Sequence, residues 1–488
     1  MFDWNWEIEN KKNLQNTIKR CKQQNIILPT FNELKHPDTI PESIQKKLEK
    51  IDLQELNPLN LFRINWRNNP VNGRIGGINY FEIAREITGV KPRIVGLVGK
   101  FFPTGAHKVG ATYGCLAPYL VSGKLDPEYH KAVWSLTGNY CRGGSFNSAL
   151  LSVHAVAILP EEMSKERFAW LKEIGAEVYA THGCESNVKE IYDKCHELEA
   201  ESGEYLILNQ FDQFGNAVWH YEVTGYTIEN LFNQIKKENQ KLSAYISATG
   251  SAGTLAAGDY LRGKFPSLKV LASEALQCPT LLFNGFGGHR IEGIGDKHVP
   301  WIHNVKNTDA VAAIDDEQTL RILRLFNDPE GHKWLTQLGV AKEELNKLSY
   351  LGISSICNLL SAIKLSKYFE YNENDIIFTV FTDSVELYNS RLNEMNSNWG
   401  KYSERQAEVD WTSIFKHQSV DYFKELSYND KKAIHNLKYF TWVEQQGKNV
   451  EELNAQWYDD NYWKERFSIV PRWDEMIKDF NSQVGLKV

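Results

Sequence analysis

The feature that most constrains the fold of this chain is an alternation of short apolar runs with helical periods between about residues 70 and 390. The runs with the length and composition of buried strands are 93–98, 132–135, 154–159, 177–180, 205–208, 244–247, 268–272 and 376–381. Strands that alternate with helices form parallel sheets, because a parallel neighbour is reached only through a crossover long enough to hold a helix. The pattern therefore predicts an α/β protein with parallel sheets.

The two flanks of this region have a different composition. Residues 1–65 are polar and rich in Lys, Asn and Gln, which predicts a mostly helical arm. From residue 391 onward no strand pattern is visible, and the tryptophans there are Trp399, Trp411, Trp442, Trp457, Trp463 and Trp473. Aromatic residues at irregular spacing in a polar background suit an extension packed on the rest of the chain or on a partner subunit. A helical cap that merely covers apolar surface is the alternative.

Composition excludes several classes of protein. A chain of 488 residues is long enough for two or three domains, and its net charge of −7 offers no basic surface for nucleic acid. No apolar run approaches the ~18 residues of a membrane span. The first residues show no cationic region followed by a hydrophobic stretch, so no signal peptide is predicted.

The cysteines indicate the compartment. Seven cysteines are scattered without paired spacing, which indicates a reduced, cytoplasmic protein. Two His/Cys pairs, at 182–184 and 195–196, have ligand side chains suited to zinc. They lie apart in the sequence, and a better candidate site exists elsewhere, so we predict no metal.

Residues 103–108 (PTGAHK) place Lys108 directly after a tight turn and at the start of a helix expected over 108–121. The strand expected at 93–98 precedes this turn. A lysine at such a junction is anchored at its backbone and free at its amine, which suits a Schiff-base nucleophile. A solvated surface lysine would fit the same local sequence, so this segment alone leaves both interpretations open.

Two further turns follow expected strands. Residues 135–139 (SLTGN) present backbone N–H groups and the Asn139 amide at the carboxyl edge of the sheet, where open α/β sheets bind their ligands. Residues 245–254 (YISATGSAGT) run from a strand through small residues into a helix expected over about 255–263. Small residues let the backbone close around an anion, and the helix N-terminus favours negative charge. A phosphate-binding loop fits best, although a tight turn without a ligand remains the alternative.

In their order along the chain, these segments resemble the fold-type II pyridoxal-phosphate enzymes: cysteine synthase, cystathionine β-synthase, threonine dehydratase and the tryptophan synthase β chain. The lysine segment is most similar to the tryptophan synthase β chain. Segments 158–164, 171–178, 292–300 and 378–385 are more similar to cystathionine β-synthase and cysteine synthase. The resemblance covers roughly residues 70–390.

The resemblance implies the tryptophan synthase β-like fold, in which two parallel-sheet domains enclose a cofactor cleft. The large cofactor-binding domain would comprise residues 66–110 and 216–390, and a smaller movable domain residues 111–215. The arm (1–65) and the extension (391–488) would flank them. Family members are commonly homodimers, so a homodimer is expected.

The resemblance also implies a role for each matching residue. Lys108 would form the internal aldimine with pyridoxal 5'-phosphate and then act as base and acid at the substrate Cα. Asn139 would bind the ring oxygen, and Ser384 would meet the ring nitrogen with a neutral hydroxyl. The phosphate would be held by Gly250, Ser251, Ala252, Gly253 and Thr254. A neutral partner leaves the ring nitrogen largely unprotonated, which favours loss of a β-substituent over transamination.

The segment around Asn139 departs from the family pattern. Cysteine synthase and cystathionine β-synthase typically carry Thr-Ser-Gly-Asn-Thr-Gly there, whereas residues 136–141 of this chain are LTGNYC. The candidate substrate contacts are Thr137, Gly138, Tyr140 and Arg142. Arg142 has the geometry to clamp a carboxylate through two hydrogen bonds, or it is simply an exposed arginine. A different or bulkier amino-acid substrate is therefore expected.

These inferences predict an enzyme that acts at Cβ of a serine- or cysteine-like amino acid through an aminoacrylate. β-Replacement of the cysteine synthase type is the first hypothesis. A β-eliminating lyase, such as an ammonia-lyase or desulfhydrase, shares every catalytic residue and stays open. A catalytically silent binding protein is the third alternative, and retention of Lys108, Asn139, the phosphate loop and Ser384 argues against it. The expected partner is a small amino-acid substrate, with no nucleic acid and no membrane.

Overall fold

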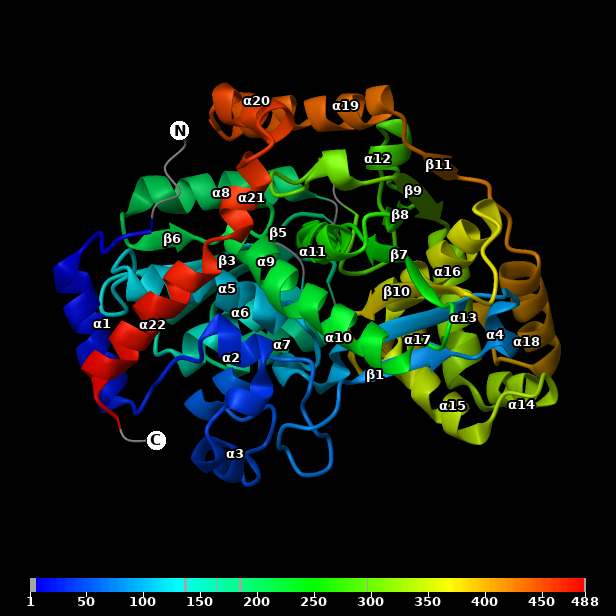
Figure 1. Ribbon diagram of the computed structural model, residues 1–488, viewed down its shortest axis with the longest axis horizontal. Helices are drawn as coiled ribbons and strands as arrows, with labels where there is room; N and C mark the ends of the chain where they lie inside the picture. The colour runs from blue at the N-terminus through cyan, green and yellow to red at the C-terminus, as the bar shows by residue number, and fades with distance from the viewer. Residues whose placement is uncertain (1–5, 136–137, 164, 184–186, 296, 487–488) are drawn as a thin grey trace.

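The structure, a computed structural model, describes residues 6–135, 138–163, 165–183, 187–295 and 297–486 (Figure 1). The chain forms two sheets that are covered by helices. One sheet has seven strands in the order β1-β2-β10-β7-β8-β9-β11, and the other has four in the order β5-β4-β3-β6. The predicted α/β class with parallel sheets is confirmed.

The smaller sheet is parallel throughout. Its strands are β3 (Lys131–Ser135), β4 (His154–Pro160), β5 (Glu177–Thr181) and β6 (Tyr205–Ile207), all near their predicted positions. The accompanying helices are α5 (Lys108–Val121), α6 (Gly138–Leu150), α7 (Lys165–Glu173) and α8 (Val188–Glu201). Helix α5 has the bounds that the sequence predicted. Helices α6, α7 and α8 carry the chain from β3 to β4, from β4 to β5 and from β5 to β6, and so link parallel strands.

The larger sheet is parallel in its centre and antiparallel at both edges. Its strands are β1 (Tyr80–Ile83), β2 (Arg93–Val98), β7 (Lys241–Ala248), β8 (Lys269–Ala275), β9 (Ala310–Ile314), β10 (Asp375–Phe381) and β11 (Phe423–Glu425). Strand β10 comes late in the sequence yet pairs with both β2 and β7. Its carboxyl end therefore lies beside the loop that leads to Lys108.

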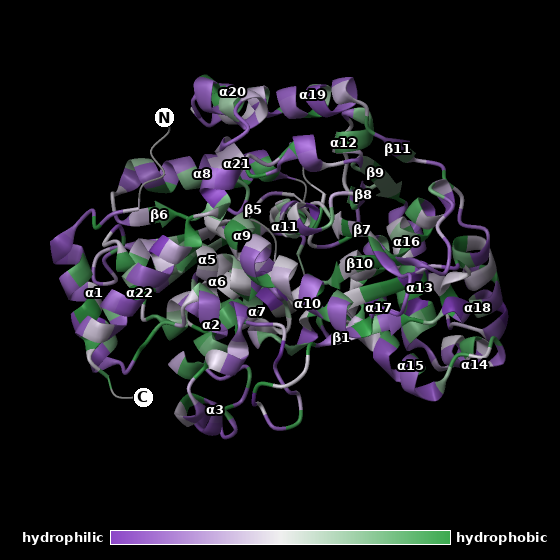
Figure 2. Cartoon of the chain, viewed as in Figure 1, coloured by the Kyte–Doolittle hydropathy of each residue, from purple (hydrophilic) through white to green (hydrophobic). Residues whose placement is uncertain are grey.

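Helices cover this sheet on its faces. They are α4 (Arg85–Thr88), α9 (Phe214–Trp219), α10 (Tyr226–Ile235), α11 (Ala256–Lys264), α12 (Thr280–Phe283), α13 (Asp316–Asn327), α14 (Pro329–Gln337), α15 (Lys342–Lys347) and α16 (Ile353–Tyr368). Helix α16 is buried along almost its whole length and packs against β7, β8, β9 and β10. The strands of this sheet are largely hydrophobic, as expected for strands buried on both faces (Figure 2).

Three strands escaped the sequence prediction, and each has a local reason. Strand β9 is rich in alanine, a residue that favours helix over strand. Strand β1 is only four residues long. Strand β11 lies in the extension, where the sequence shows no strand pattern, and it pairs with β9. Strand β11 has only three residues, of which Lys424 and Glu425 are exposed, so it is too short to show an apolar period.

The two ends of the chain pack together. The arm contains α1 (Lys11–Gln23), α2 (Phe31–Lys35) and α3 (Glu42–Leu48), and the extension contains α17 (Asn389–Trp399), α18 (Glu404–Asp410), α19 (Tyr428–Asn436), α20 (Val450–Tyr458), α21 (Tyr462–Phe467) and α22 (Val470–Val484). The extension crosses from the larger to the smaller sheet, so that α22 lies beside α1, α2 and α5 (Figure 1). The Asp474 carboxylate accepts the backbone N–H groups of Phe31 and Asn32 at 2.7 and 3.0 Å.

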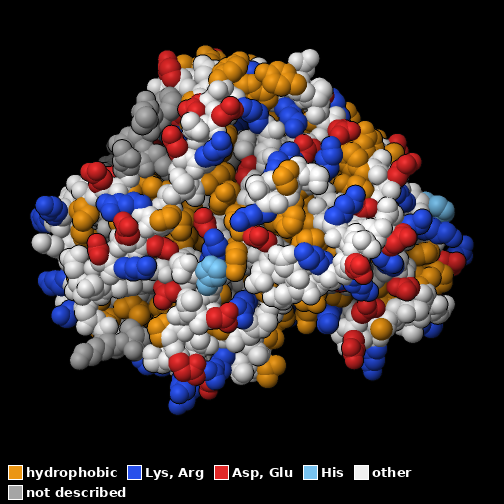
Figure 3. Space-filling model, viewed as in Figure 1, with side chains coloured by type: hydrophobic (Ala, Val, Ile, Leu, Met, Phe, Trp, Pro, Cys, Tyr) orange, Lys and Arg blue, Asp and Glu red, His pale blue; other side chains and the backbone are white. Residues whose placement is uncertain are grey.

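The surface is charged with both signs. Lys and Arg are interspersed with Asp and Glu over the visible face, without a large area of one sign (Figure 3). Among the described helices, none is by itself long and apolar enough to cross a membrane, and one sharply bent pair, 342–350 with 353–368, passes on length and composition alone. The cysteines that the structure describes are buried.

Candidate active site

A cavity lies where the carboxyl ends of β7 and β10 meet the start of α5. The residues that line it are His107, Lys108, Asn139, Ser247, Ala248, Gly250, Ser251, Ala252, Thr254, Gly293, Ile294, Asn358 and Thr382. It draws on the lysine turn, the Asn139 turn, the small-residue loop and the segment after β10. These segments are far apart in the sequence, and the fold brings them together at one sheet edge.

Lys108 is the first residue of α5, directly after the loop that follows β2. The loop turns at Thr104 and Gly105, whose φ values of +67° and +73° lie in the left-handed region. Glycine adopts this conformation at little cost, so the turn brings the chain sharply into the helix. The Lys108 side chain is 8% exposed, and its Nζ donates to Ser251 Oγ at 3.2 Å. The lysine amine and the small-residue loop therefore meet.

The small-residue loop follows β7 and enters α11 through a short 3-10 turn (Gly253–Leu255). Among the described residues, no acceptor is found for the backbone N–H groups of Gly250, Ser251 and Ala252. These groups lie ahead of a helix N-terminus, an arrangement that binds anions. The loop is thus equipped to hold a phosphate.

Asn216, on α9, braces this loop from behind. Its Nδ2 donates to Ser251 Oγ at 3.0 Å and to Gln210 O at 2.9 Å. A Cβ atom at Gly253 would lie 2.1 Å from Asn216 Oδ1, so only glycine fits there. The loop backbone is therefore fixed by a side chain that no sequence motif identifies.

Asn139 lies at the start of α6 and is buried. Its Nδ2 donates to Asp383 Oδ2 at 2.6 Å, and the Tyr388 hydroxyl donates to the same oxygen at 2.7 Å. Burial raises the pKa of Asp383 above its ordinary value, while these two hydrogen bonds oppose the rise. Asn139 Oδ1 accepts no hydrogen bond from the described residues. Asp383 therefore fixes the amide and leaves its oxygen side available.

Two hydroxyl groups lie just beyond β10. Thr382 lines the cavity, and its Oγ1 is 3.2 Å from His107 Nε2. Burial, and then the charge of Lys108, holds the pKa of His107 well below its ordinary value, so this imidazole is neutral. Ser384, the predicted ring-nitrogen contact, is buried two residues further on but does not belong to the described lining.

The predicted substrate contacts have different surroundings. Thr137 lies outside the described residues. Gly138 is buried, and a Cβ atom there would strike the Arg167 side chain at 2.5 Å. The Tyr140 hydroxyl donates to Leu208 O at 3.1 Å, so it is engaged inside the smaller-sheet region. The Arg142 guanidinium stacks over the Trp170 ring at 4.5 Å, and burial lowers its pKa to about 10.

A buried ion pair joins α7 to the segment that contributes Gly293 and Ile294 to the cavity. Arg167 Nη2 lies 2.9 Å from Glu292 Oε2, and Arg391 Nε donates to Glu292 Oε1 at 2.6 Å. The arginines come from α7 and α17, and Glu292 precedes two lining residues. This triad crosses from the smaller-sheet region to the larger one.

Sequence inspection missed several of these residues. Thr382 lies within the recognised 378–385 segment, so that comparison could have identified it. Asn216 and Arg167 have no local signal, because their partners lie in distant segments that only the fold brings close.

A protein-family profile described as "Pyridoxal-phosphate dependent enzyme" matches residues 100–332, a range that contains Lys108, Asn139 and the small-residue loop. The chain is 29% identical over 267 residues to a cysteine synthase of Staphylococcus aureus (strain Mu50), which covers 54% of this chain and 77% of that protein. It is 23% identical over 322 residues to the cystathionine beta-synthase of Saccharomyces cerevisiae, covering 64% and 60%.

Solved structures share the fold. A cysteine synthase from Entamoeba histolytica aligns with a TM-score of 0.58 and 21% identity, over 70% of this chain and 94% of that one. A hydrogen sulfide-producing enzyme from Fusobacterium nucleatum aligns with a TM-score of 0.55 and 22% identity, over 63% and 95%. The arm and the extension lie outside the range that the family profile matches.

Proposed function

Because the chain belongs to the fold-type II pyridoxal-phosphate-dependent enzymes, the family that its sequence resembles, we propose that it replaces the β-substituent of a serine- or cysteine-like amino acid with a second nucleophile. Pyridoxal 5'-phosphate is its cofactor, and its activity is of the β-replacement or lyase kind. The observation that carries the proposal is the meeting of Lys108, Asn139 and the small-residue loop in one cavity.

The residues of this cavity fit the cofactor. The N–H groups of Gly250, Ser251 and Ala252, for which the described part of the chain supplies no acceptor, would hold its phosphate, together with Gly253 and Thr254. Asn139 would bind the ring oxygen, and the Lys108 amine would attach to the aldehyde carbon. When bound, the cofactor withdraws electrons from the substrate Cα and so makes the neighbouring bonds labile.

The role of Lys108 at the substrate is proton transfer. Its Nζ would take the proton from Cα and later return one, as a general base and then a general acid. The surrounding burial keeps bulk water from competing for that proton, and Ser251 Oγ at 3.2 Å holds the amine between transfers. Asp383 and Tyr388 act through Asn139 by fixing its amide.

A neutral contact to the ring nitrogen supports chemistry at Cβ. We assign this contact to Ser384, in the segment that follows the end of β10 at Phe381, with Thr382 as the alternative residue. Both side chains are uncharged hydroxyls. Neither would stabilise a protonated ring nitrogen as a carboxylate does, so loss of a β-substituent is favoured over transamination. Gly138 and Arg142 remain proposed contacts to the substrate.

The competing function is β-elimination, in which water completes the cycle. Product analysis distinguishes the two. Holoenzyme is incubated with O-acetylserine, serine or cysteine, with and without sulfide or a thiol, and both the new amino acid and pyruvate are measured. Replacement predicts a new amino acid whose formation depends on the nucleophile and suppresses pyruvate. Pyruvate release that ignores the nucleophile would identify a lyase, and no turnover or cofactor absorbance change with any amino acid would identify a silent binding protein.

The remaining assignments are proposals on the same footing. We divide the chain into an arm (1–65), a large domain (66–110 and 216–390), a smaller movable domain (111–215) and an extension (391–488). The confinement of the four-stranded sheet to 131–207 supports this division, and β11 ties the extension to the large domain. We propose a homodimer because family members are commonly dimers, and cysteines scattered without paired spacing support a cytoplasmic location.

A further inference from the structure

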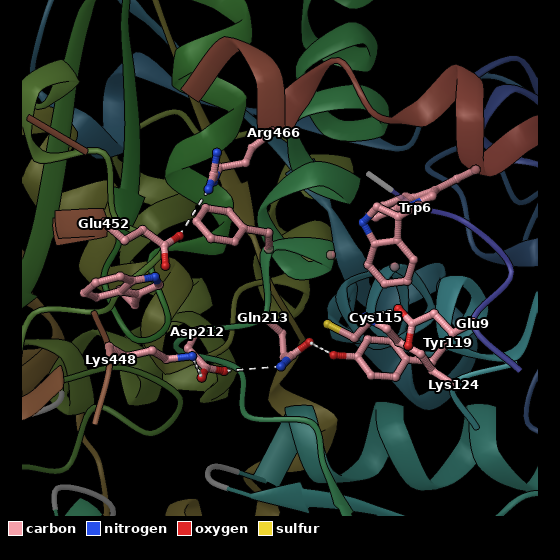
Figure 4. Close-up of a pocket in the computed structure, with 15 residues that line it drawn as sticks. Trp6, Glu9, Cys115, Tyr119, Lys124, Asp212, Gln213, Lys448, Glu452 and Arg466 are labelled. Carbon is pink, nitrogen blue, oxygen red and sulfur yellow. Dashed lines mark hydrogen bonds and ion pairs between the residues drawn. The ribbon is translucent and has the colours of Figure 1, made fainter. Parts of the chain in front are cut away.

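A second cavity of about 340 Å³ lies between the two ends of the chain and the catalytic body (Figure 4). It is named the extension cavity and is lined by Trp6, Glu9, Gly114, Cys115, Tyr119, Lys124, Asp212, Gln213, Phe214, Gly215, Trp301, Lys448, Glu452, Arg466 and Trp473. Its size is at the lower end of the roughly 300–1,000 Å³ typical of small-molecule sites. The cavity around Lys108 is called the cofactor cavity from here on. Among the described residues the extension cavity shares no lining residue with it. Several of its residues lie outside the range of the family profile.

The charges of the extension cavity are balanced in pairs. Lys448 Nζ lies 2.7 Å from Asp212 Oδ2, and Arg466 Nη2 lies 3.1 Å from Glu452 Oε1. Burial disfavours the Lys448 ammonium, but Asp212 beside it raises the pKa of Lys448 overall, so the amine is charged. Paired charges of both signs oppose a phosphate or any other polyanion, because the anion would face carboxylates as well as cations.

A hydrogen-bonded row forms one side of the cavity. Asp212 accepts from Lys448 and, at 3.5 Å, from Gln213 Nε2, and the Tyr119 hydroxyl donates to Gln213 Oε1 at 3.2 Å. Figure 4 shows this row below the open space, with the Glu452–Arg466 pair at one end and Trp6 at the other. Two of the charged pairs thus lie at one end of the cavity, and Lys124, whose Nζ lies 2.9 Å from Glu9 Oε1, forms a third pair at the Trp6 end.

Aromatic rings form much of the remaining wall. Trp6 contacts Trp473 edge to face with ring centroids 5.3 Å apart, and Lys124 Nζ lies 4.6 Å from the Trp6 ring centroid. Trp301 and Phe214 add further ring surface. Rigid aromatic rings bind apolar groups with a small loss of conformational entropy.

We propose that the extension cavity binds a free amino acid with an apolar side chain and thereby regulates the enzyme. The ligand ammonium would face Asp212 and Glu452, its carboxylate would face Lys448 and Arg466, and its side chain would lie among the aromatic rings. A zwitterion is the ligand that satisfies both signs of charge without leaving a buried charge unpaired. The binding step is independent of the reaction proposed for the cofactor cavity.

Two helices connect this cavity to the cofactor cavity. Gly114 and Cys115 belong to α5, which begins at Lys108, and Gly215 precedes Asn216, which braces Ser251. A Cβ atom at Gly114 would stand 2.3 Å from Gly215 O, so the two helices touch backbone to backbone here. A ligand that shifts this contact moves Lys108 and the phosphate loop together. We therefore expect bound ligand to change the KM for the amino-acid substrate.

The first test uses unmodified holoenzyme and matched ligands. L-Leucine, L-methionine and L-phenylalanine are titrated by calorimetry, while tryptophan fluorescence reports the extension cavity and cofactor absorbance reports the active site. Phenethylamine lacks the carboxylate of L-phenylalanine and 3-phenylpropionate lacks its ammonium group. Each therefore retains the phenyl ring and only one of the two charged groups. At least one of the three amino acids should bind saturably with unchanged cofactor absorbance, and both phenyl analogues should bind at least about tenfold more weakly than L-phenylalanine or not at all.

The second test uses a matched pair of variants on α20. Glu452→Gln removes one of the three carboxylates that line the cavity, whereas Glu451→Gln removes an exposed carboxylate next to it. Glu452→Gln should weaken binding at least about tenfold and leave ligand-free kcat unchanged, while Glu451→Gln should bind as the wild type does. Circular dichroism confirms that both variants are folded.

Three outcomes would overturn the proposal. They are the absence of saturable binding by all three amino acids, binding that Glu452→Gln does not weaken, and binding that shifts the cofactor absorbance in proportion to occupancy. Binding without any change in KM or kcat would overturn the regulatory role. None of these outcomes bears on whether the enzyme replaces or eliminates a β-substituent, because that is decided by the products.

Discussion

Arg167 Nη2 contacts Glu292 Oε2 at 2.9 Å, and both side chains are buried, with relative exposures of 3% and 7%. Arg391 binds the other oxygen of the same carboxylate. One carboxylate thus joins helix α7 of the smaller-sheet region, the segment that lines the cofactor cavity, and helix α17. Since Arg167 also packs against Gly138, the triad couples the Asn139 turn to the opposite wall of the cavity.

Glu292→Gln should destabilise the enzyme and raise the KM for its amino-acid substrate. Removing this carboxylate leaves two guanidinium groups without their shared partner, which costs roughly 3–5 kcal/mol when such a charge is buried. Glu394→Gln is the control, because Glu394 also pairs with Arg391 but is half exposed, and its loss should cost less than about 1 kcal/mol. Thermal unfolding and steady-state kinetics measure both effects. Equal losses in the two variants would contradict a structural role for the triad.

Lys108→Ala should abolish covalent cofactor attachment and turnover while the fold persists. The reason is that Nζ is the amine placed against the phosphate loop. Borohydride reduction followed by peptide mapping should label Lys108 in the wild type and leave the variant unlabelled. Lys100→Ala, in which the replaced lysine forms a surface pair with Glu386, should retain both label and activity. A visible aldimine band in Lys108→Ala would place the attachment at another lysine.

Gly253→Ala should weaken cofactor retention. The added methyl group would collide with Asn216, whose amide holds Ser251, so the loop must shift. Gly263→Ala is the matched control, because it lies in α11 with open space around its Cβ position. The control should be neutral or stabilising by up to about 1 kcal/mol. Equilibrium dialysis of the cofactor measures the difference, and equal cofactor affinity in both variants would show that the loop tolerates a side chain.

Ser384→Asp should increase abortive transamination, because a carboxylate beside the ring nitrogen favours its protonation. Pyridoxamine formation during turnover is the readout, compared among variants that keep their cofactor absorbance. Thr382→Asp is the informative partner, since Thr382 lines the cavity and contacts His107. If only Thr382→Asp changes product partitioning, the ring-nitrogen contact is Thr382 and the assignment of Ser384 is wrong.

The sequence could predict what is encoded locally. The bounds of α5 and the position of β10 follow from an uninterrupted apolar pattern. Lys108 directly follows a turn that contains Gly105. The small-residue loop was visible because glycine and serine carry its function at consecutive positions. Such features need no knowledge of distant segments.

The sequence could not predict what depends on long-range contacts. Residues 423–425 form strand β11 only because they pair with the edge strand β9. Asn216 and Arg167 are ordinary polar residues until the fold brings Ser251 and Glu292 to them. The extension cavity is lined by residues from both ends of the chain, so no local sequence pattern predicts it.

Stability should fall between about pH 4.5 and pH 8 because of Glu274. This buried carboxyl on β8 accepts the N–H groups of Leu281 and Leu282 at 2.9 Å each, and burial raises its pKa from 4.5 to about 8 against those bonds. The folded protein then keeps a proton that the unfolded chain has released, so its contribution is full below pH 4.5 and lost as the pH rises through 8. Glu274→Gln removes this titration, so its free energy of unfolding should decline less over that range, by up to roughly 5 kcal/mol for a shift of this size, and its melting temperature should decline less as well. The exposed Glu343→Gln should follow the wild type, and parallel pH curves for Glu274→Gln and wild type would show that Glu274 does not titrate in this window.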